Sequence, residues 1–312
     1  MRISSVYKIL SVVVLAVLTL VALFMPVKSI GNGWIPIMSG LETWEILQNG
    51  AVSILLGIGM IGTVLFSLYF LLRRTSSINF QAVVVVFLLL VSANPAFLHF
   101  STIQILLLLL VWMHYCVVEK QIFTAFMLLS LASLFYAPSI WLIPLSLSFI
   151  PFSGTPDSLK SFVKALAGFL LPHIYMLVFR WISFDDAGVY FLGYWDSITD
   201  FHFMERKLLL PGLFLSGYLI YIISRASIFA VRSSTSKLVQ GILKMQILSL
   251  ALSLPFFICF DRDGSSLFPI IAYPAAVLIA FYFNNSSNIK RSSAELVLLL
   301  LAIIINCVSH YI

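Results

Sequence analysis

Charged residues are scarce in this sequence. Only 10% of its 312 residues are Asp, Glu, Lys or Arg, whereas 61% are hydrophobic. A soluble domain of this length needs more polar surface than so few charges supply, so the long apolar runs indicate membrane spans. The net charge of +6 comes from basic residues that stand singly or in pairs between those runs. This distribution is typical of the loops of a membrane protein, not of a nucleic-acid-binding surface.

Cysteines and signature motifs are also few. Cys116, Cys259 and Cys307 lie in or beside apolar segments without paired spacing, which indicates neither a disulfide framework nor a zinc site. The sequence holds no HExxH motif, Walker A loop, nucleophile elbow or dinucleotide fingerprint. These absences leave no motif that names a reaction.

Ionisable residues are nearly absent from the apolar runs themselves. Lys244 and Glu295 lie near the ends of such runs, where snorkelling to the interface explains them. We assign His99, His114 and His202 to the membrane surfaces, because none is paired at metal-ligand spacing. The shortage of charge at mid-membrane disfavours an ion-coupled transporter or a proton channel.

The apolar runs predict one all-helical transmembrane bundle that occupies residues 1–312, with about ten or eleven segments. The segments expected from the sequence are 9–25, 51–72, 80–93, 97–118, 121–137, 139–150, 160–180, 208–224, 239–258, 266–283 and 294–311.

The stretch 121–150 decides how these segments are oriented. It contains no charge and holds Pro138 and Pro144. As one helix it would be about 45 Å long, which exceeds a hydrocarbon core of about 30 Å, and proline interrupts helices. We therefore expect a short broken hairpin that turns at Tyr136-Ala137-Pro138.

The basic residues support the hairpin. If the chain turns back, most of the 18 Lys and Arg residues fall on one side; if it crosses once, they divide evenly between the two sides. The positive-inside rule favours the uneven split and predicts a cytoplasmic N-terminus. Most acidic residues and tryptophans then lie on the outer face, where we expect any chemistry to occur.

Two groups of acidic residues are candidates for that chemistry. Glu42 and Glu45 are three residues apart and share one face of a helix; one could act as general base, or both could form the polar face of an interfacial helix. Asp261 and Asp263 could share a divalent cation while Arg262 grips a phosphate. The alternative for these three residues is a solvated turn.

An expected long loop over 181–207 carries much of the remaining polar and aromatic material. Its density of aromatic residues suits either an amphipathic segment that lies on the membrane or the wall of a groove for a lipid chain or a sugar. The residues assigned to a substrate groove, including one from the first outer loop, are Trp44, Asp185, Asp186, Tyr194, Trp195 and His202.

Two apolar stretches carry a family resemblance. Leu129-Ser130-Leu131-Ala132-Ser133-Leu134-Phe135-Tyr136-Ala137-Pro138 and Gly168-Phe169-Leu170-Leu171-Pro172 resemble a family of polytopic inner-membrane proteins from Bacteroidetes known as a domain of unknown function. That resemblance implies location and not activity. The layout is more distantly similar to C-type glycosyltransferases, which move sugars from polyisoprenyl-phosphate carriers at the outer face.

The second resemblance implies specific roles for the candidate residues. It puts Glu42 or Glu45 in the catalytic position, although this first loop lacks an adjacent acidic pair and the Asp-x-Asp lies far downstream at Asp261. We therefore expect an inner-membrane protein of cell-envelope biogenesis that transfers a sugar from a polyisoprenyl-phosphate lipid, with a divalent cation as a possible cofactor. The alternatives are a non-catalytic subunit or scaffold of an envelope-assembly complex, with membrane partners, and a lipid or solute transporter.

Overall fold

The computed structural model describes residues 50–73, 75, 77–92, 99–150, 158–184, 187–199, 210–233, 235–260, 267–286 and 289–309. Every regular element in these ranges is a helix, which confirms the all-helical prediction. The segment expected at 9–25 lies outside the described residues. The described elements are α4 (Gly50–Leu72), α5 (Phe80–Ser92), α6 (Thr102–Val118), α7 (Ile122–Phe135), η2 (Ala137–Leu142), α8 (Ile143–Ser148), α9 (Ser158–Phe184), α10 (Ala187–Thr199), α11 (Leu210–Arg232), α12 (Lys237–Phe260), α13 (Phe268–Asn285) and α14 (Ile289–Ser309).

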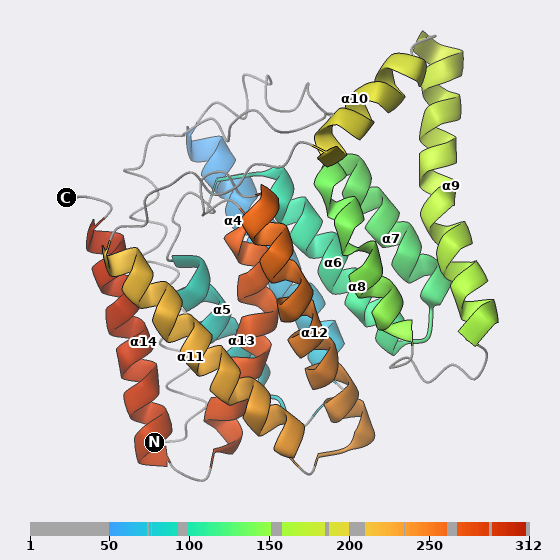
Figure 1. Cartoon of the computed structure of the whole chain (residues 1–312). Coiled ribbons are helices and arrows are strands. Elements are labelled where there is room, and N and C mark those ends of the chain that lie inside the picture. Colours follow the sequence, from blue (N-terminus) through green and yellow to red (C-terminus); the bar gives the residue numbers. More distant parts are fainter. Residues whose placement is uncertain are drawn as a thin grey trace.

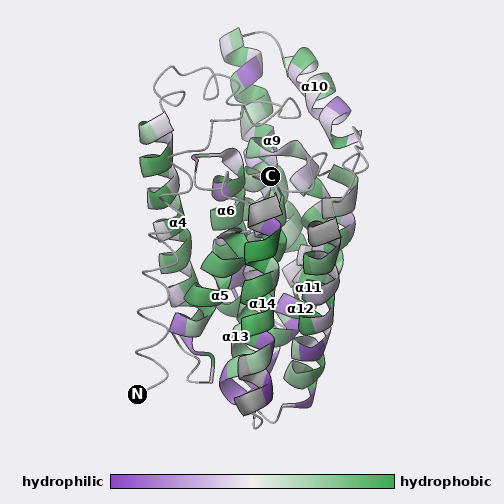
Figure 2. Cartoon of the chain, turned by 90° about the vertical axis from the view of Figure 1, so that its left-hand side faces the viewer, coloured by the Kyte–Doolittle hydropathy of each residue, from purple (hydrophilic) through white to green (hydrophobic). Residues whose placement is uncertain are grey.

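Five of the described helices are long and apolar enough to cross a membrane. They are α4, Leu159–Phe184 of α9, Phe214–Arg232 of α11, Lys237–Phe256 of α12, and α13. Shorter apolar helices stand among them: most of α5, all of α6 and α7, the η2–α8 stretch, and Ala294–Asn306 of α14. Figure 2 shows hydrophobic colours over the mid-section and hydrophilic colours gathered toward the ends.

Successive helices run in opposite directions along one bundle (Figure 1). We call the end where α10 lies the upper end and the opposite end the lower end. α4 begins at the upper end, α12 finishes there, and α9 climbs to it before α10 turns across the top. The short links from α6 to α7 and from α11 to α12 lie at the lower end.

The stretch 121–150 forms the expected hairpin. α7 runs upward, and η2 and α8 run back down beside it (Figure 1). The helix breaks at Tyr136, whose backbone is extended, and Pro138 falls in the first turn of η2. A missing backbone donor costs nothing at that position, because the first N–H groups of a helix have no intrahelical partner. The hairpin prediction is confirmed in its bounds to within a few residues.

α13 is the centre of the bundle. It packs against α5, α11 and α12, and every side chain from Pro269 to Tyr282 is buried. The sequence provides four alanines in this stretch, which let neighbouring backbones approach closely. Large buried side chains, such as Phe87 of α5 and Phe281 of α13, complete the core.

The structure corrects the long loop expected over 181–207. α9 continues to Phe184, and residues 187–199 form α10. Tyr190, Tyr194 and Ile198 recur every four residues and give α10 one buried face, so this aromatic segment gains more by packing as a helix than by remaining irregular. α11 also extends to Arg232 instead of 224, which brings Arg225 inside the helix.

Candidate functional site

Most of the residues assigned to a site from the sequence lie outside the described residues, and their convergence stays a prediction. They are Glu42, Trp44, Glu45, Asp185, Asp186, His202, Asp261, Arg262 and Asp263. Within the described residues, no three His, Cys, Asp or Glu side chains are grouped to hold a metal ion. The divalent cation therefore remains an expectation that rests on Asp261 and Asp263.

Tyr194 and Trp195, the two groove residues that the structure describes, point to different sides of α10. Tyr194 is 7% exposed and packs toward the bundle, whereas Trp195 is 56% exposed. The neighbouring Phe191 and Leu192 are exposed as well. α10 thus buries one aromatic face and presents another, as a helix in a membrane interface does. Whether either residue lines a substrate groove stays a prediction.

The buried hydroxyl of Tyr194 leads to a polar cluster that joins three helices. The Nδ1 atom of His173, on α9, lies 2.7 Å from Ser130 Oγ. Its Nε2 atom lies 3.1 Å from Ser133 Oγ and 3.0 Å from the Tyr194 hydroxyl. The two serines stand three residues apart on α7 and so face the same way. We call Ser130, Ser133, His173 and Tyr194 the His173 cluster.

His173 has hydrogen-bond partners on both ring nitrogens. Nδ1 lies 3.2 Å from the carbonyl oxygen of Phe169, which can only accept a hydrogen bond and so favours a proton on Nδ1. Ser133 donates its own proton to the Ser130 carbonyl at 2.8 Å, so its contact with Nε2 favours a proton there instead. The two ring nitrogens therefore compete for the single proton of the neutral ring.

The tyrosines of α10 stay protonated at physiological pH. Burial raises the pKa of Tyr194 above its ordinary value. Burial also raises the pKa of Tyr190 to about 12, although Arg180 acts in the opposite direction. The Arg180 guanidinium lies 5.3 Å from the centre of the Tyr190 ring. Tyr194 therefore ties α10 to α9 through the hydrogen bond between its neutral hydroxyl and His173.

An apolar pocket of about 450 Å³ lies between α7 and α9, beside the His173 cluster. It is lined by Leu131, Leu134, Phe135, Leu171, Pro172, Tyr175 and Met176. The lining surface is entirely apolar, so the pocket suits a hydrocarbon chain and not a sugar or an ion.

A second polar network lies in the core, where the sequence analysis placed none. His114 was assigned to the membrane surface, but the structure buries it between α6, α12 and α13. Gln246 Nε2 donates to the Tyr273 hydroxyl at 3.1 Å, and Tyr273 lies 2.7 Å from His114 Nδ1. Ser249 Oγ lies 3.2 Å from His114 Nε2 and donates to the Met245 carbonyl. Because the Ser249 proton is used there, His114 Nε2 carries the ring proton and Nδ1 accepts from Tyr273.

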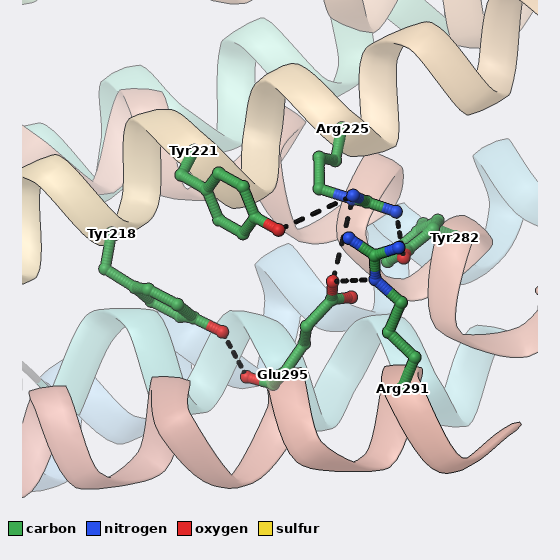
Figure 3. A network of polar contacts seen from close by, with 6 residues as sticks. All are labelled: Tyr218, Tyr221, Arg225, Tyr282, Arg291 and Glu295. Atoms are coloured by element: carbon green, nitrogen blue, oxygen red, sulfur yellow. Dashed lines mark hydrogen bonds and ion pairs between the residues drawn. The ribbon is translucent and has the colours of Figure 1, made fainter. Parts of the chain in front are cut away.

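A third group, shown in Figure 3, is charged. Glu295 of α14 lies 3.2 Å from Arg291 Nε and 3.6 Å from Arg225 Nε, through the same oxygen, Oε1. Arg225 of α11 also donates to the hydroxyls of Tyr282 and Tyr221 at 3.3 and 3.5 Å. Tyr218 donates to the backbone carbonyl of Glu295 at 2.6 Å. We call these six residues the Glu295 cluster.

The Glu295 cluster corrects an interpretation of the sequence. Snorkelling was expected to carry the Glu295 carboxylate to the interface, but its side chain is only 7% exposed. Two arginines pair with it, and burial of a carboxylate requires such partners. The i,i+4 spacing of Arg291 and Glu295 was the available signal; the contribution of Arg225 depends on how α11 packs, which local spacing does not contain.

Comparisons with protein families, with curated proteins and with solved structures found no match. The functional argument therefore rests on the residues and their geometry.

Proposed function

We propose that this chain is a multi-pass protein of the bacterial inner membrane, with its lower end in the cytoplasm. The observation that carries this proposal is the position of the described basic residues along the helices. Helix ends at the lower end carry Arg73, Lys120, Lys160, Lys164, Arg232, Lys237 and Arg291, whereas Arg180 lies near the upper end of α9. Such an excess of Lys and Arg at one end is the mark of the cytoplasmic side.

Extraction tests the membrane assignment. The full-length chain should stay with the membrane pellet after washing with alkaline carbonate or urea and should dissolve only in detergent. Release of the chain by carbonate would contradict the assignment, because helices that cross a bilayer are not displaced by removal of electrostatic contacts.

We further propose that the protein transfers a sugar from a polyisoprenyl-phosphate carrier at the outer face. Three observations support this activity. α4 begins and α12 ends at the upper end. In the sequence, Glu42 and Glu45 come shortly before the start of α4, and Asp261–Asp263 come directly after the end of α12. α10 presents Phe191, Leu192 and Trp195 at the same upper end. The pocket between α7 and α9 suits an isoprenoid chain.

The proposed reaction uses the acidic residues as follows. The acceptor hydroxyl attacks the anomeric carbon, the bond from that carbon to the phosphate oxygen breaks, and the polyisoprenyl phosphate leaves with its electron pair. Glu42 or Glu45 takes the proton from the acceptor hydroxyl. Arg262 would hold the phosphate, and Asp261 and Asp263 would hold a divalent cation that supplies further positive charge to it.

An assay in nanodiscs tests this activity. The purified chain is incubated with a polyisoprenyl phosphate that carries a radiolabelled hexose and with an envelope extract as the source of the acceptor hydroxyl, and loss of the label from the carrier is measured. Glu42→Gln or Glu45→Gln should lower the rate about 10²–10⁴-fold, whereas Asp196→Asn, an exposed carboxylate on α10, should leave it unchanged. Absence of turnover, or full activity in both glutamate variants, would refute the proposal.

The scaffold alternative is favoured by one feature, the exposed face of α9. Over the most apolar part of α9 only 11% of the residues are buried, and in the membrane either lipid or a partner helix must cover the rest. If the chain is a scaffold, Glu42→Gln and Glu45→Gln should complement a deletion strain fully. Substitutions on the exposed face of α9, such as Ile174→Ala and Val178→Ala, should then abolish co-purification of a partner membrane protein.

A further inference from the structure

The Glu295 cluster lies at the opposite end of the bundle from the proposed catalytic site and carries an unbalanced charge. Its two guanidinium groups face one carboxylate, so the cluster has one excess positive charge. The carboxylate is buried at 7% exposure, while the side chains of Arg225 and Arg291 are 31% and 51% exposed. The surface that the cluster presents is therefore cationic.

The position of the cluster along the helices matches the headgroup region. Glu295 lies about 9 Å along the axis from the start of α14 at Ile289, and Arg225 about 10 Å from the end of α11 at Arg232. The apolar stretch of α14 begins at Ala294, immediately before Glu295. With the lower end in the cytoplasm, the two arginines stand where lipid phosphates of the inner leaflet lie.

The helix surfaces above the cluster are apolar and exposed. Phe214 lies about three turns up the same face of α11 as Arg225, and Leu298 lies about two turns above Arg291 on α14. Both side chains are exposed, as are Leu301 and Ile305 farther along α14. Acyl chains whose phosphate rests on the arginines would run along these residues.

We propose that the Glu295 cluster binds the phosphate of one anionic phospholipid from the cytoplasmic leaflet. A phosphodiester carries a single negative charge and balances the excess charge of the cluster. Guanidinium groups present paired N–H donors that match phosphate oxygens, and basic pockets between membrane helices on the cytoplasmic side bind such headgroups. A zwitterionic lipid would bring its own cation against the arginines. The proposal requires the lower end to be cytoplasmic but does not depend on the proposed sugar transfer.

Native mass spectrometry of the detergent-solubilised full-length chain tests this site. The probes are phosphatidylglycerol and phosphatidylcholine with the same acyl chains. We expect one phosphatidylglycerol to bind at least about tenfold more tightly than phosphatidylcholine, and Arg225→Gln or Arg291→Gln to lower that affinity about tenfold or more. The matched control is Arg232→Gln, which removes the same charge from the exposed last residue of α11 and should leave the affinity unchanged.

Two further measurements keep the test decisive if an arginine variant fails to fold. Glu295→Gln removes the competing carboxylate and raises the excess charge, so it should tighten binding of phosphatidylglycerol; a merely structural role predicts weaker or unchanged binding. Inorganic phosphate at millimolar concentration should not displace the lipid. Equal binding of the two lipids, equal effects of the Arg291 and Arg232 substitutions, or displacement by inorganic phosphate would each overturn the assignment to an anionic lipid.

Discussion

α13 and α9 are both long apolar helices, yet they occupy opposite environments. Over their most apolar 18 residues, 78% of the residues of α13 are buried against 11% of those of α9. That 18-residue stretch of α9 is nevertheless the more apolar of the two. Hydropathy therefore indicates which segments cross a membrane and does not indicate which of them lie at the centre of the bundle.

Small residues account for the difference between the two helices. α13 carries Ala272, Ala275, Ala276 and Ala280, all of them buried. Two small residues of α9, Ala165 and Gly168, are buried where that helix meets α7, and its remaining surface is mostly large and exposed. Because lipid tails are as apolar as leucine, helices associate in membranes through close packing, which small residues permit.

The largest expected effect comes from enlarging one alanine on each helix. Ala276→Leu adds volume at a fully buried position of α13 and should destabilise the fold by about 3 kcal/mol. Ala167→Leu makes the same change at an exposed position of α9 and should stay within about 0.5 kcal/mol of the parent. The free energy of unfolding in bicelles, measured by steric trapping, checks both values. Equal losses would mean that α9 is packed as tightly as α13.

A smaller effect is expected at a close backbone contact between α9 and α7. A Cβ at Gly168 would collide with the carbonyl oxygen of Phe123 on α7, and backbone cannot move aside as a flexible side chain can. Gly168→Ala should therefore cost about 2 kcal/mol in the same unfolding measurement. Gly62→Ala on α4, where nothing obstructs a Cβ, is the control and should be neutral. A neutral Gly168→Ala would refute the close α7–α9 contact.

The smallest of the three effects compares tyrosine hydroxyls. Tyr273→Phe removes the hydroxyl that His114 and Gln246 contact in the core, and unpaired buried polar groups should cost about 1–2 kcal/mol. Tyr175→Phe on α9 removes an exposed hydroxyl and should change the free energy of unfolding by less than about 0.5 kcal/mol. If Tyr273→Phe proves as mild as its control, the core network contributes no stability.

The hairpin and several of the helix ends could be predicted from the sequence because they depend on local signals. Proline at 138, the span length and the positions of Lys and Arg sufficed for them. The polar clusters depend instead on which helices meet. Ser130 and Ser133 signal a polar face on α7, but their pairing with His173 follows from the crossing of α7 and α9. Hydropathy likewise did not predict α10, because a short helix that mixes polar and apolar residues does not resemble a membrane span.

Cysteine accessibility measures the orientation of the bundle, on which both the outer site and the inner lipid site depend. In a background with Cys116, Cys259 and Cys307 replaced by serine, single cysteines are introduced at Ser236, between α11 and α12, and at Thr199, the last residue of α10. An impermeant maleimide applied to intact spheroplasts should label Thr199→Cys at once and Ser236→Cys only after permeabilisation. Labelling of Ser236→Cys in intact spheroplasts with protection of Thr199→Cys would contradict the orientation.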